Sequence, residues 1–491
     1  MRKVLLLTAA ILILSINAMA ADTPAYDKNL LRLPGQLLSV AVEDIDGDGD
    51  NDIVAFSNNA DKRYPGRSIS VFYARRGGSF PQSADQSFTL APDAAVFDIG
   101  DASGSGKKSI CYIGPNGVFA YNLSGRSFST RPVQLIRSEN IFSQQDQSSL
   151  PRWNFIMNAS GEQPTILVPE VNRLLVYAGG SGGFRQTGSI PFATRSAFTE
   201  SIISGDAGPL TISHRLPLVS AVGFNSRPEK DLFITWDDNA DVFLKKSGGF
   251  AEAPALRFRP GLTDGAKTDL IENTSVQAED LNGEGRSDLI VTKMTGGVAQ
   301  TKTLVFIYMR KKDGSFPDKP SQTIITEGVI GPCVLDINSD GRKDIILPSV
   351  KMGINNFINM LTSRQINMNI GIYLQDRNGR FPDRPTKEKS VSFKLDISNM
   401  GKNVKPVMAF GRFTKAAGYG LAVASKEESV SLFMPDRYSI LGDNAALTLS
   451  VNAPSEIDAV DINRDGIDDL IMSYRKVKDR SWQIYVFVSK T

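Results

Sequence analysis

Nine residues near the start of the chain carry carboxylates at a density that suggests metal chemistry. Between Asp44 and Asp52, five aspartates alternate with Ile, Gly, Gly and Asn, and an apolar run follows. Carboxylates this close repel one another strongly unless positive charge lies between them. Oxygen ligands at every second position, with glycine where the chain bends, are typical of a loop that wraps a calcium ion. The segment therefore predicts a calcium site.

Three later segments repeat the pattern, beginning at Asp280, Asp336 and Asp461. Each has an acidic or amide side chain at its first, third and fifth positions, Gly at the sixth and Asp at the ninth. The alternative interpretation is a tight turn without an ion, because Asp and Asn favour turns in any case. Four copies in step with one another favour the metal interpretation.

Weaker copies lie between the strong ones, which makes eight units. Residues 101–109 keep the glycines but have Ser at ligand positions, and fainter copies lie near 158, 224 and 411. Short apolar strands and Gly-x-Phe turns recur in step with the loops and predict an all-β fold. The loops at 280 and 336 are 56 residues apart, and such a period with about four strands per unit predicts a β-propeller. We expect eight four-stranded antiparallel blades, with seven as the alternative because two units are faint.

The two ends of the chain predict how the ring closes. The last unit stops at its third strand, within residues 482–491, and lacks a fourth. Residues 29–33 stand just before the first loop, where a fourth strand would belong. We therefore expect the N- and C-terminal strands to pair, which would remove the open edges of the ring.

The N-terminus predicts export. Residues 1–20 have a basic start, an apolar core and the small-residue site Ala18-Met-Ala20, as in a secretory signal peptide. The apolar run is shorter than the roughly 20 residues that a membrane span needs. We expect residues 21–491 to form a single propeller domain without a membrane span, monomeric and either periplasmic or extracellular.

Composition excludes one class of partner and bounds the cysteine chemistry. With 55 basic and 53 acidic residues, the chain gives no reason to expect nucleic acid as a partner. Cys111 and Cys333 are the two cysteines, and the repeat register separates them, so we expect two buried free thiols. Apolar residues at helical spacing within about 351–363 predict a short helical insertion. It would either pack across a propeller face or bind a ligand or partner.

No catalytic site is evident from residue types, although one class of chemistry stays open. His214 is the single histidine, and no Gly-x-Ser-x-Gly motif accompanies it. Cys-His and His-metal chemistry have no support either. Hydrolysis by paired carboxylates stays possible, because Asp and Glu are plentiful.

The repeated loops resemble the FG-GAP/VCBS repeats of integrin α-subunit propellers and of many secreted bacterial proteins. The resemblance covers essentially the whole mature chain and implies about four structural calcium ions, one per intact loop, between the first two strands of a blade. The side-chain ligands that it implies are Asp44, Asp46, Asp48, Asp52, Asp280, Asn282, Glu284, Asp288, Asp336, Asn338, Asp340, Asp344, Asp461, Asn463, Asp465 and Asp469. The backbone carbonyls that it implies belong to the seventh positions, Asp50, Arg286, Arg342 and Ile467.

We therefore expect a calcium-stabilised, non-catalytic binding or scaffold module for a protein or carbohydrate ligand. The alternative is a secreted carbohydrate-active enzyme, a polysaccharide lyase or hydrolase on a propeller scaffold. A purely structural role in an envelope assembly is a third possibility, and it would predict a large apolar surface patch.

Overall fold

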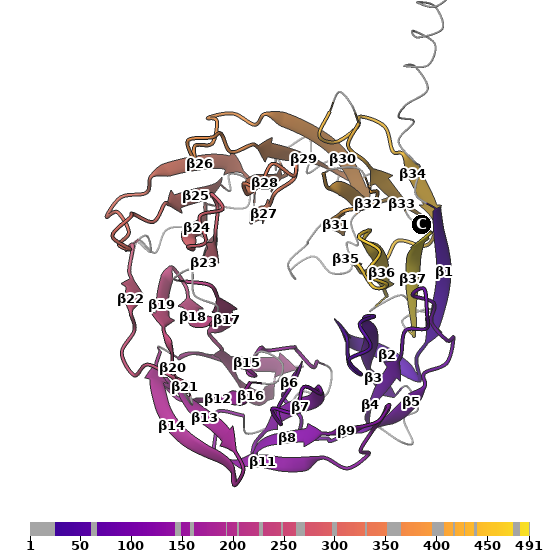
Figure 1. The fold of residues 1–491 in the computed structure, drawn as a ribbon, viewed down its shortest axis with the longest axis vertical. Helices are drawn as coiled ribbons and strands as arrows, with labels where there is room; N and C mark the ends of the chain where they lie inside the picture. Colours follow the sequence, from indigo (N-terminus) through magenta and orange to yellow (C-terminus); the bar gives the residue numbers. More distant parts are fainter. Residues whose placement is uncertain are drawn as a thin grey trace, which may run out of the picture.

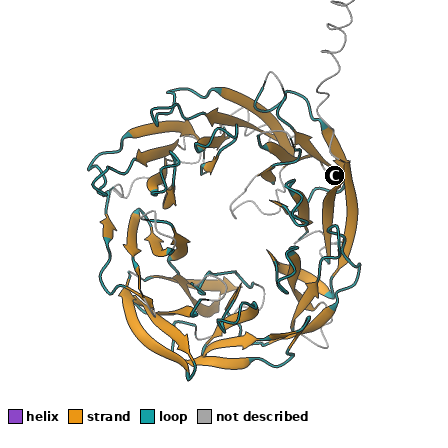
Figure 2. Cartoon of the chain, in the orientation of Figure 1, coloured by secondary structure: helices purple, strands orange, loops and turns teal. Residues whose placement is uncertain are grey.

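The computed structural model describes residues 25–59, 66–142, 149–157, 162–192, 194–203, 206–224, 229–246, 249–261, 271–296, 302–328, 331–350, 365–394, 407–415, 418–426, 428–436, 439–474 and 482–490. The predicted signal peptide at 1–20 and the predicted helical insertion at about 351–363 lie outside these ranges. Regular structure within them is β-strand (Figure 2). Across this part of the chain, no helix has the length and hydrophobicity of a membrane span.

The strands form eight blade sheets arranged in a ring (Figure 1). Seven of the sheets have four antiparallel strands, and the third in chain order has three. The chain is therefore a β-propeller, and the preferred number of eight blades is confirmed. The faint units near 158 and 411 correspond to real blades, the third and the seventh.

The strands of each blade follow one another from the inside of the ring outward. Blade 1 contains β2 (Gly35–Glu43), β3 (Asp52–Asn59), β4 (Arg67–Phe72) and β5 (Gln86–Leu90). Blade 2 contains β6 (Val96–Gly100), β7 (Ser109–Gly114), β8 (Gly117–Tyr121) and β11 (Val133–Arg137). Blade 3 contains β12 (Thr165–Glu170), β13 (Arg173–Gly180) and β14 (Gly183–Pro191). Blade 4 contains β17 (Leu218–Val222), β18 (Asp231–Trp236), β19 (Asn239–Phe243) and β22 (Leu256–Phe258).

The second half of the chain repeats this order. Blade 5 contains β23 (Ile271–Glu279), β24 (Asp288–Gly296), β25 (Lys302–Tyr308) and β26 (Gln322–Glu327). Blade 6 contains β27 (Cys333–Leu335), β28 (Asp344–Ser349), β29 (Gln365–Tyr373) and β30 (Lys387–Lys394). Blade 7 contains β31 (Met408–Gly411), β32 (Gly420–Lys426), β33 (Ser429–Phe433) and β34 (Leu447–Ser450). Blade 8 contains β35 (Glu456–Val460), β36 (Asp469–Ser473), β37 (Gln483–Lys490) and, from the N-terminus, β1 (Ala25–Arg32).

The pairing of β1 with β37 closes the ring. The two strands run antiparallel, from Ala25 opposite Lys490 to Arg32 opposite Gln483. The predicted pairing of the two chain ends is confirmed. Because each end supplies a strand to the same blade, separating them would expose the backbone of both strands.

The hydrophobic core consists of clusters that lie between neighbouring blades. One cluster, for example, joins Val54 and Phe56 of blade 1 to Ile110 and Tyr112 of blade 2. Other clusters join blades 8 and 1, 7 and 8, 6 and 7, 5 and 6, and 4 and 5, and the largest joins blades 2, 3 and 4. Each blade is thus stabilised mainly by the apolar side chains of its neighbours.

Blade 3 departs from the repeat in two ways. Its innermost strand is reduced to an isolated bridge between Ile156 and Ile166. After its last strand comes an inserted hairpin of β15 (Arg195–Ile203) and β16 (Asp206–Arg215), which accounts for the long step before the fourth unit. Two further strand pairs form short hairpins within blades. They are β9 (Leu123–Ser124) with β10 (Ser127–Phe128), and β20 (Lys245–Lys246) with β21 (Gly249–Phe250).

The two cysteines lie in different parts of the ring and are free thiols, as the repeat register predicted. Cys111 is fully buried, and burial raises the pKa of its thiol. Cys333 is only half-buried, so the expectation of burial holds fully for one of the two.

Candidate metal-binding loops

The four acidic loops occupy the same place in their blades, between the innermost strand and the next one. They span residues 44–51, 280–287, 336–343 and 461–468, and the following strand begins with the ninth-position aspartate in each case. Because the strands of a blade are antiparallel, the loops that join first to second strands all emerge on one face of the ring. We call this the loop face.

The first loop brings three carboxylates together. One oxygen each of Asp44, Asp46 and Asp48 lies within 4.8 Å of the other two. Calcium binds protein oxygens at about 2.3–2.6 Å, so a single ion has room to contact all three. Within the described ranges, this is the one group of three or more Asp, Glu, His or Cys side chains that meets this distance. The donor chemistry and the spacing both fit calcium.

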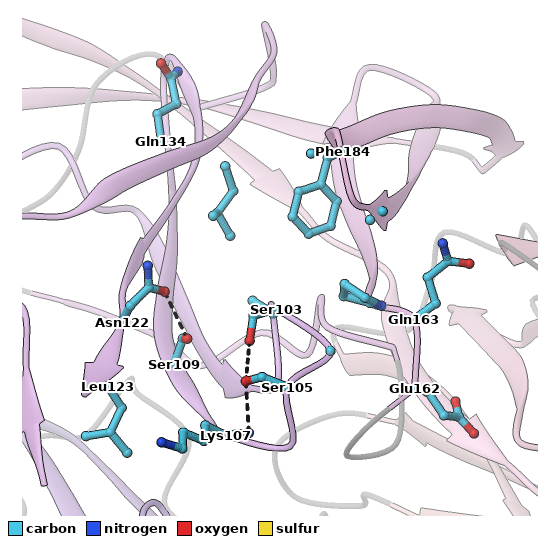
Figure 3. Close-up of a pocket in the computed structure, with 17 residues that line it drawn as sticks. Ser103, Ser105, Lys107, Ser109, Asn122, Leu123, Gln134, Glu162, Gln163 and Phe184 are labelled. Atoms are coloured by element: carbon cyan, nitrogen blue, oxygen red, sulfur yellow. Dashed lines mark hydrogen bonds between the residues drawn. The ribbon is translucent and has the colours of Figure 1, made fainter. Parts of the chain in front are cut away.

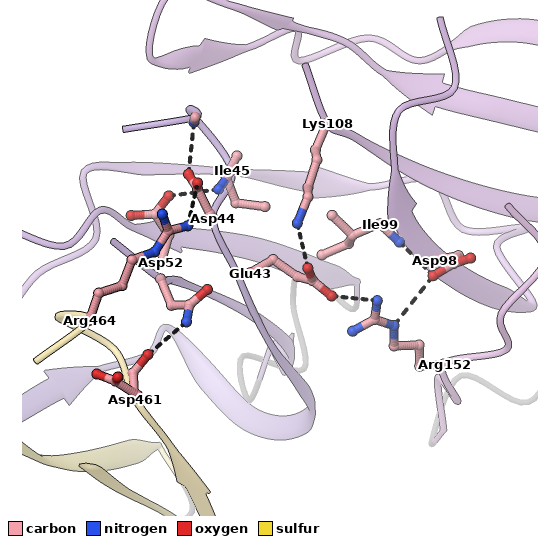
Figure 4. A network of polar contacts seen from close by, with 12 residues as sticks. Glu43, Asp44, Ile45, Asp52, Asp98, Ile99, Lys108, Arg152, Asp461 and Arg464 are labelled. Atoms are coloured by element: carbon pink, nitrogen blue, oxygen red, sulfur yellow. Dashed lines mark hydrogen bonds and ion pairs between the residues drawn. The ribbon is translucent and has the colours of Figure 1, made fainter. Parts of the chain in front are cut away.

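Two arginines from neighbouring blades add positive charge to the first loop. Arg126 of blade 2 pairs with Asp46 at 2.9 Å and lies 4.0 Å from Asp48. Arg464 of the last loop pairs with Asp44 at 3.3 Å (Figure 4). These contacts reduce the repulsion among the aspartates. They also place guanidinium groups on the same carboxylates that a cation would contact.

The ninth-position aspartate fixes each loop to its own blade. Asp52 is fully buried, and its two oxygens accept the backbone N–H groups of Ile45 at 3.0 Å and Ala74 at 2.8 Å. The other three loops repeat both bonds, which run from Leu281 and Arg310 to Asp288, from Ile337 and Gln375 to Asp344, and from Ile462 and Ser489 to Asp469. A carboxylate oxygen can accept more than one contact, so these bonds leave room for an ion, and the role of this position as a calcium ligand stays a prediction.

Burial changes the acidity of these four aspartates. It raises the pKa from 3.8 to about 7 for Asp52 and to about 6 for Asp288, Asp344 and Asp469. The backbone hydrogen bonds oppose this rise, and the carboxylates at neighbouring loop positions add to it. Ionising these groups is therefore less favourable inside the fold than in water, and a cation close by would favour it.

The later three loops share the turn but use their oxygens differently. In each, the first-position aspartate accepts the backbone N–H groups of the fifth and sixth positions at 2.8 to 3.1 Å. The third-position asparagines, Asn282, Asn338 and Asn463, accept the fifth-position N–H. The fifth-position carboxylates bind neighbouring side chains: Glu284 pairs with Arg286, Asp340 with Arg342, and Asp465 accepts the Ser489 hydroxyl. Because asparagine replaces aspartate at the third position, these loops carry less negative charge, and we predict that they bind calcium more weakly than the first.

The loop of blade 2 makes the same turn with a different set of side chains. Asp101 keeps the first position and accepts the backbone N–H groups of Ser103, Ser105 and Gly106 at 2.6 to 3.2 Å. The Ser103 hydroxyl also donates to Asp101 at 3.1 Å and lies 2.7 Å from the Ser105 hydroxyl. Hydroxyl groups thus occupy the positions that carboxylates occupy in the first loop.

Loops of adjacent blades are joined by backbone hydrogen bonds. The eighth-position N–H of one loop donates to the second-position carbonyl of the loop in the preceding blade. These bonds run from Asn51 to Ile462, from Lys343 to Leu281 and from Tyr419 to Ile337, with N–O distances of 2.9, 2.9 and 3.0 Å. The N–H of Asp468 in the blade 8 loop also donates to the carbonyl of Arg412 in the blade 7 loop at 2.7 Å, so the loops of blades 5, 6, 7, 8 and 1 form one connected series.

Sequence reasoning missed an ion-pair network where the first three blades meet (Figure 4). Glu43 pairs with Lys108 at 2.5 Å and with Arg152 at 2.7 Å, and Arg152 also contacts the buried Asp98 at 3.3 Å. Burial raises the pKa of Glu43, but the hydrogen bonds from Lys108 and Arg152 outweigh it and keep the pKa below its usual value. The sequence did contain a signal for this network, because Glu43 stands just before the first loop and the oppositely charged Lys108 stands at the eighth position of the blade 2 loop.

Two solved structures are similar to the chain at low identity. A lectin of Agrocybe aegerita that recognises non-reducing terminal N-acetylglucosamine is 13% identical, with 75% of this chain and 91% of the lectin covered and a TM-score of 0.35. The Dos1 propeller is 8% identical, with 95% of this chain and 96% of Dos1 covered and a TM-score of 0.41. No curated protein sequence matches the chain.

A family match covers the second and third acidic loops. Residues 280–347 match the FG-GAP-like repeat, and this confirms the resemblance that the loop pattern predicted. The match spans most of blade 5 and the beginning of blade 6, so it includes two consecutive copies of the loop. Together with the sheet topology, it makes the chain an eight-bladed β-propeller that contains an FG-GAP-like repeat.

Proposed function

We propose that the chain is an exported, calcium-stabilised binding or scaffold module without catalytic activity, whose partner is a protein or a carbohydrate. The observation that carries the proposal is the convergence of one oxygen each of Asp44, Asp46 and Asp48 to within 4.8 Å in blade 1, next to the blade that closes the ring. A calcium ion supplies a divalent positive charge among these carboxylates. Its effect there would be structural, because it offsets repulsion in a loop that the blades on both sides contact.

Different residues of the first loop have different roles in the proposal. Asp44, Asp46 and Asp48 would contact the ion in the first loop, while Asp52 fastens the loop to its blade through two backbone N–H groups. Hydrogen bonds between adjacent loops then extend this order around part of the ring. A propeller held in this way offers a rigid loop face, and rigid surfaces lose less conformational entropy when a partner binds.

A thermal melt of residues 21–491 tests the calcium part of the proposal. Unfolding is followed in about 10 mM calcium, which is about 10 to 100 times the dissociation constants of extracellular calcium modules, and again in excess chelator. At about 100 times the dissociation constant, one site adds about 2.7 kcal/mol to the free energy of unfolding. We expect a clear upward shift of the midpoint with calcium. An unchanged midpoint would overturn the calcium role of these loops.

Export has a separate test. When the full chain is expressed with its N-terminus intact, we expect a mature protein that begins at Ala21 in the periplasm or the medium. N-terminal sequencing of the fractionated protein gives the result. An unprocessed chain that begins at Met1 and stays in the cytoplasm would contradict the export assignment.

A further inference from the structure

A cavity of about 580 Å³ opens on the loop face between blades 2 and 3 (Figure 3). Blade 2 contributes the 102–109 loop and residues from the ends of its outer strands. Blade 3 contributes residues 162–164 and the turn between β13 and β14, which carries Phe184. Binding pockets for small molecules have volumes of about 300–1,000 Å³, so the cavity is large enough for a ligand.

At three other junctions, those between blades 8 and 1, 1 and 2, and 5 and 6, the blades are joined at this level by a hydrogen-bonded contact that we call the clasp. In a clasp, an amide side chain of the outermost strand bonds the backbone of the phenylalanine in the outer turn of the next blade. The clasps join Asn29 to Phe80, Gln86 to Phe128 and Gln322 to Phe381. Gln86 makes both possible bonds, accepting the Phe128 N–H at 2.7 Å and donating to its carbonyl at 2.8 Å.

The junction between blades 2 and 3 has a valine where a clasp needs an amide. Val133 pairs with Ala120 in blade 2, as Gln86 pairs with Val71 in blade 1. A valine side chain has no hydrogen-bonding group, and that of Val133 is 52% exposed. The clasp that joins blades 1 and 2 therefore cannot form one junction further along, and the cavity lies at this junction.

The aromatic side of the cavity is held in place by close packing. The Phe184 ring is half-buried and lies against Gly179, together with Pro164. A Cβ atom on Gly179 would lie 2.5 Å from Pro164 and 3.2 Å from the Phe184 ring, so a larger residue would force this side of the cavity apart. The ring extends toward the loop of blade 2 (Figure 3). It therefore presents a fixed apolar surface to the cavity.

The opposite side of the cavity carries uncharged hydrogen-bonding groups. Ser103 and Ser105 come from the blade 2 loop, and Asn122, which accepts the Ser109 hydroxyl at 3.2 Å, comes from the end of β8. Lys107 and Glu162, from opposite sides, are the charged residues of the lining, and their charges balance. A phosphate ligand would need clustered cations, and a metal ion would need clustered carboxylates. This lining has neither, and its chemistry suits a neutral polyhydroxyl molecule.

We propose that this cavity binds a neutral saccharide residue, with one face of the sugar ring on Phe184 and its hydroxyl groups toward Ser103, Ser105 and Asn122. The proposal rests on the binding-module function above and assigns it a ligand class and a site. Sugars combine C–H groups on the ring faces with hydroxyl groups around the rim. An aromatic ring opposite hydroxyl and amide groups matches both features.

The probes are four neutral disaccharides, maltose, cellobiose, lactose and chitobiose, each added at about 10 mM because a dissociation constant near 1 mM is about −4 kcal/mol of binding. Saturation-transfer-difference NMR and calorimetry are recorded on residues 21–491 in calcium. Phe184→Ala removes the ring, and Asn122→Ala removes an exposed amide without changing the core. Phe316→Ala is the matched control, because Phe316 is in the same turn of blade 5 and lies outside the cavity lining.

We expect at least one disaccharide to bind, with affinity lowered by about tenfold or more in Phe184→Ala and by a smaller factor in Asn122→Ala. Binding that both variants leave unchanged, or that Phe316→Ala weakens equally, would overturn the site. No binding by any of the four would overturn the ligand class. The calcium-dependent melt is measured on the same samples: if calcium still shifts the midpoint, only the cavity proposal fails, whereas loss of that shift in the wild type counts against the proposed function.

Discussion

The side-chain amide of Asn51 donates to the backbone carbonyl of Asp461 at 2.9 Å, across the junction where the ring closes. Asn51 belongs to the first acidic loop, and Asp461 opens the last one. The backbone N–H of Asn51 donates to Ile462, the next residue along. The two loops that flank the ring closure are therefore one hydrogen-bonded unit, beside the pairing of β1 with β37.

Asn51→Ala should weaken this closure. One hydrogen bond is lost and a partly buried carbonyl loses its partner, so we expect the free energy of unfolding to fall by about 1 kcal/mol. Urea unfolding with and without calcium measures the change. Asn444→Ala, at an exposed position between β33 and β34 of blade 7, is the control. Equal losses in both variants would show that the contact contributes nothing specific.

Asp44→Ala should lower thermal stability mainly when calcium is present. The substitution removes one of the three converging carboxylates and leaves the clasp and strand contacts of the blade in place. Ser103→Ala changes the third position of the blade 2 loop, where we expect no calcium-dependent effect. Differential scanning calorimetry in calcium and in chelator compares the two variants. A loss of the same size in both buffers for Asp44→Ala would contradict the metal interpretation of the first loop.

In chelator, stability should fall as the pH rises from about 4 to about 7. Burial raises the pKa of Asp52 to about 7 and that of Asp288, Asp344 and Asp469 to about 6. Between 3.8 and these values the folded state binds more protons than the unfolded state, so raising the pH favours unfolding. Calcium favours the ionised carboxylates, so the stabilisation that it gives should grow over the same range. Melts at pH 4.5 and pH 7.5 test this, and a calcium shift of equal size at both would contradict it.

The fold could be predicted because the features that determine it are local and repeated. Alternating apolar strands, the turn glycines and the Asp-rich loops recur once per blade, and each copy supports the others. Even blades 3 and 7 form, although their loops have lost nearly all ligand residues, because Ile166 and Leu421 keep the apolar strands that pack between blades. The ring closure followed from counting strands at the two ends.

The surroundings of the candidate sites could not be predicted in the same way. The pairing of Arg126 with Asp46 joins residues 80 positions apart in different blades, and no spacing rule relates them. Beside the cavity that holds Phe184, the clasp position is occupied by Val133, and its equivalence to Gln86 can be seen only when the blades are aligned by their strand pairing. Contacts between repeats depend on how side chains from two blades pack together, and the residue pattern within one blade does not specify that packing.

Gln86→Ala should destabilise the junction between blades 1 and 2. Both hydrogen bonds of this clasp are lost, and the N–H and carbonyl of Phe128 are left without the partners they have now. We expect the free energy of unfolding to fall by about 1–3 kcal/mol, in calcium and in chelator alike. Thr89→Ala, at an exposed position of the same strand, is the control. If hydrogen exchange shows no faster opening of β5 in Gln86→Ala than in the control, the clasp is not a stabilising contact.

Arg126→Gln should increase the calcium affinity of the first loop. The guanidinium lies 2.9 Å from Asp46 and 4.0 Å from Asp48, so it repels a cation that approaches the same carboxylates. Two unit charges about 4 Å apart interact by about 1 kcal/mol in water and by about 4 kcal/mol near a protein surface. Because the side chain is half-exposed, we take the lower end and expect an affinity gain of about three- to tenfold.

A competition titration against a calcium chelator dye measures that gain in the Arg126→Gln variant. Arg131→Gln, at an exposed position of the same blade, has the same change in net charge and serves as the control. In chelator, the melting temperature of Arg126→Gln should be lower than that of the wild type, because the aspartates then lack both calcium and the positive charge of Arg126. Tighter binding with lower stability in chelator is therefore the paired result that we expect. If Arg126→Gln and Arg131→Gln change the affinity equally, the effect is one of net charge, and the contact with Asp46 does not control the site.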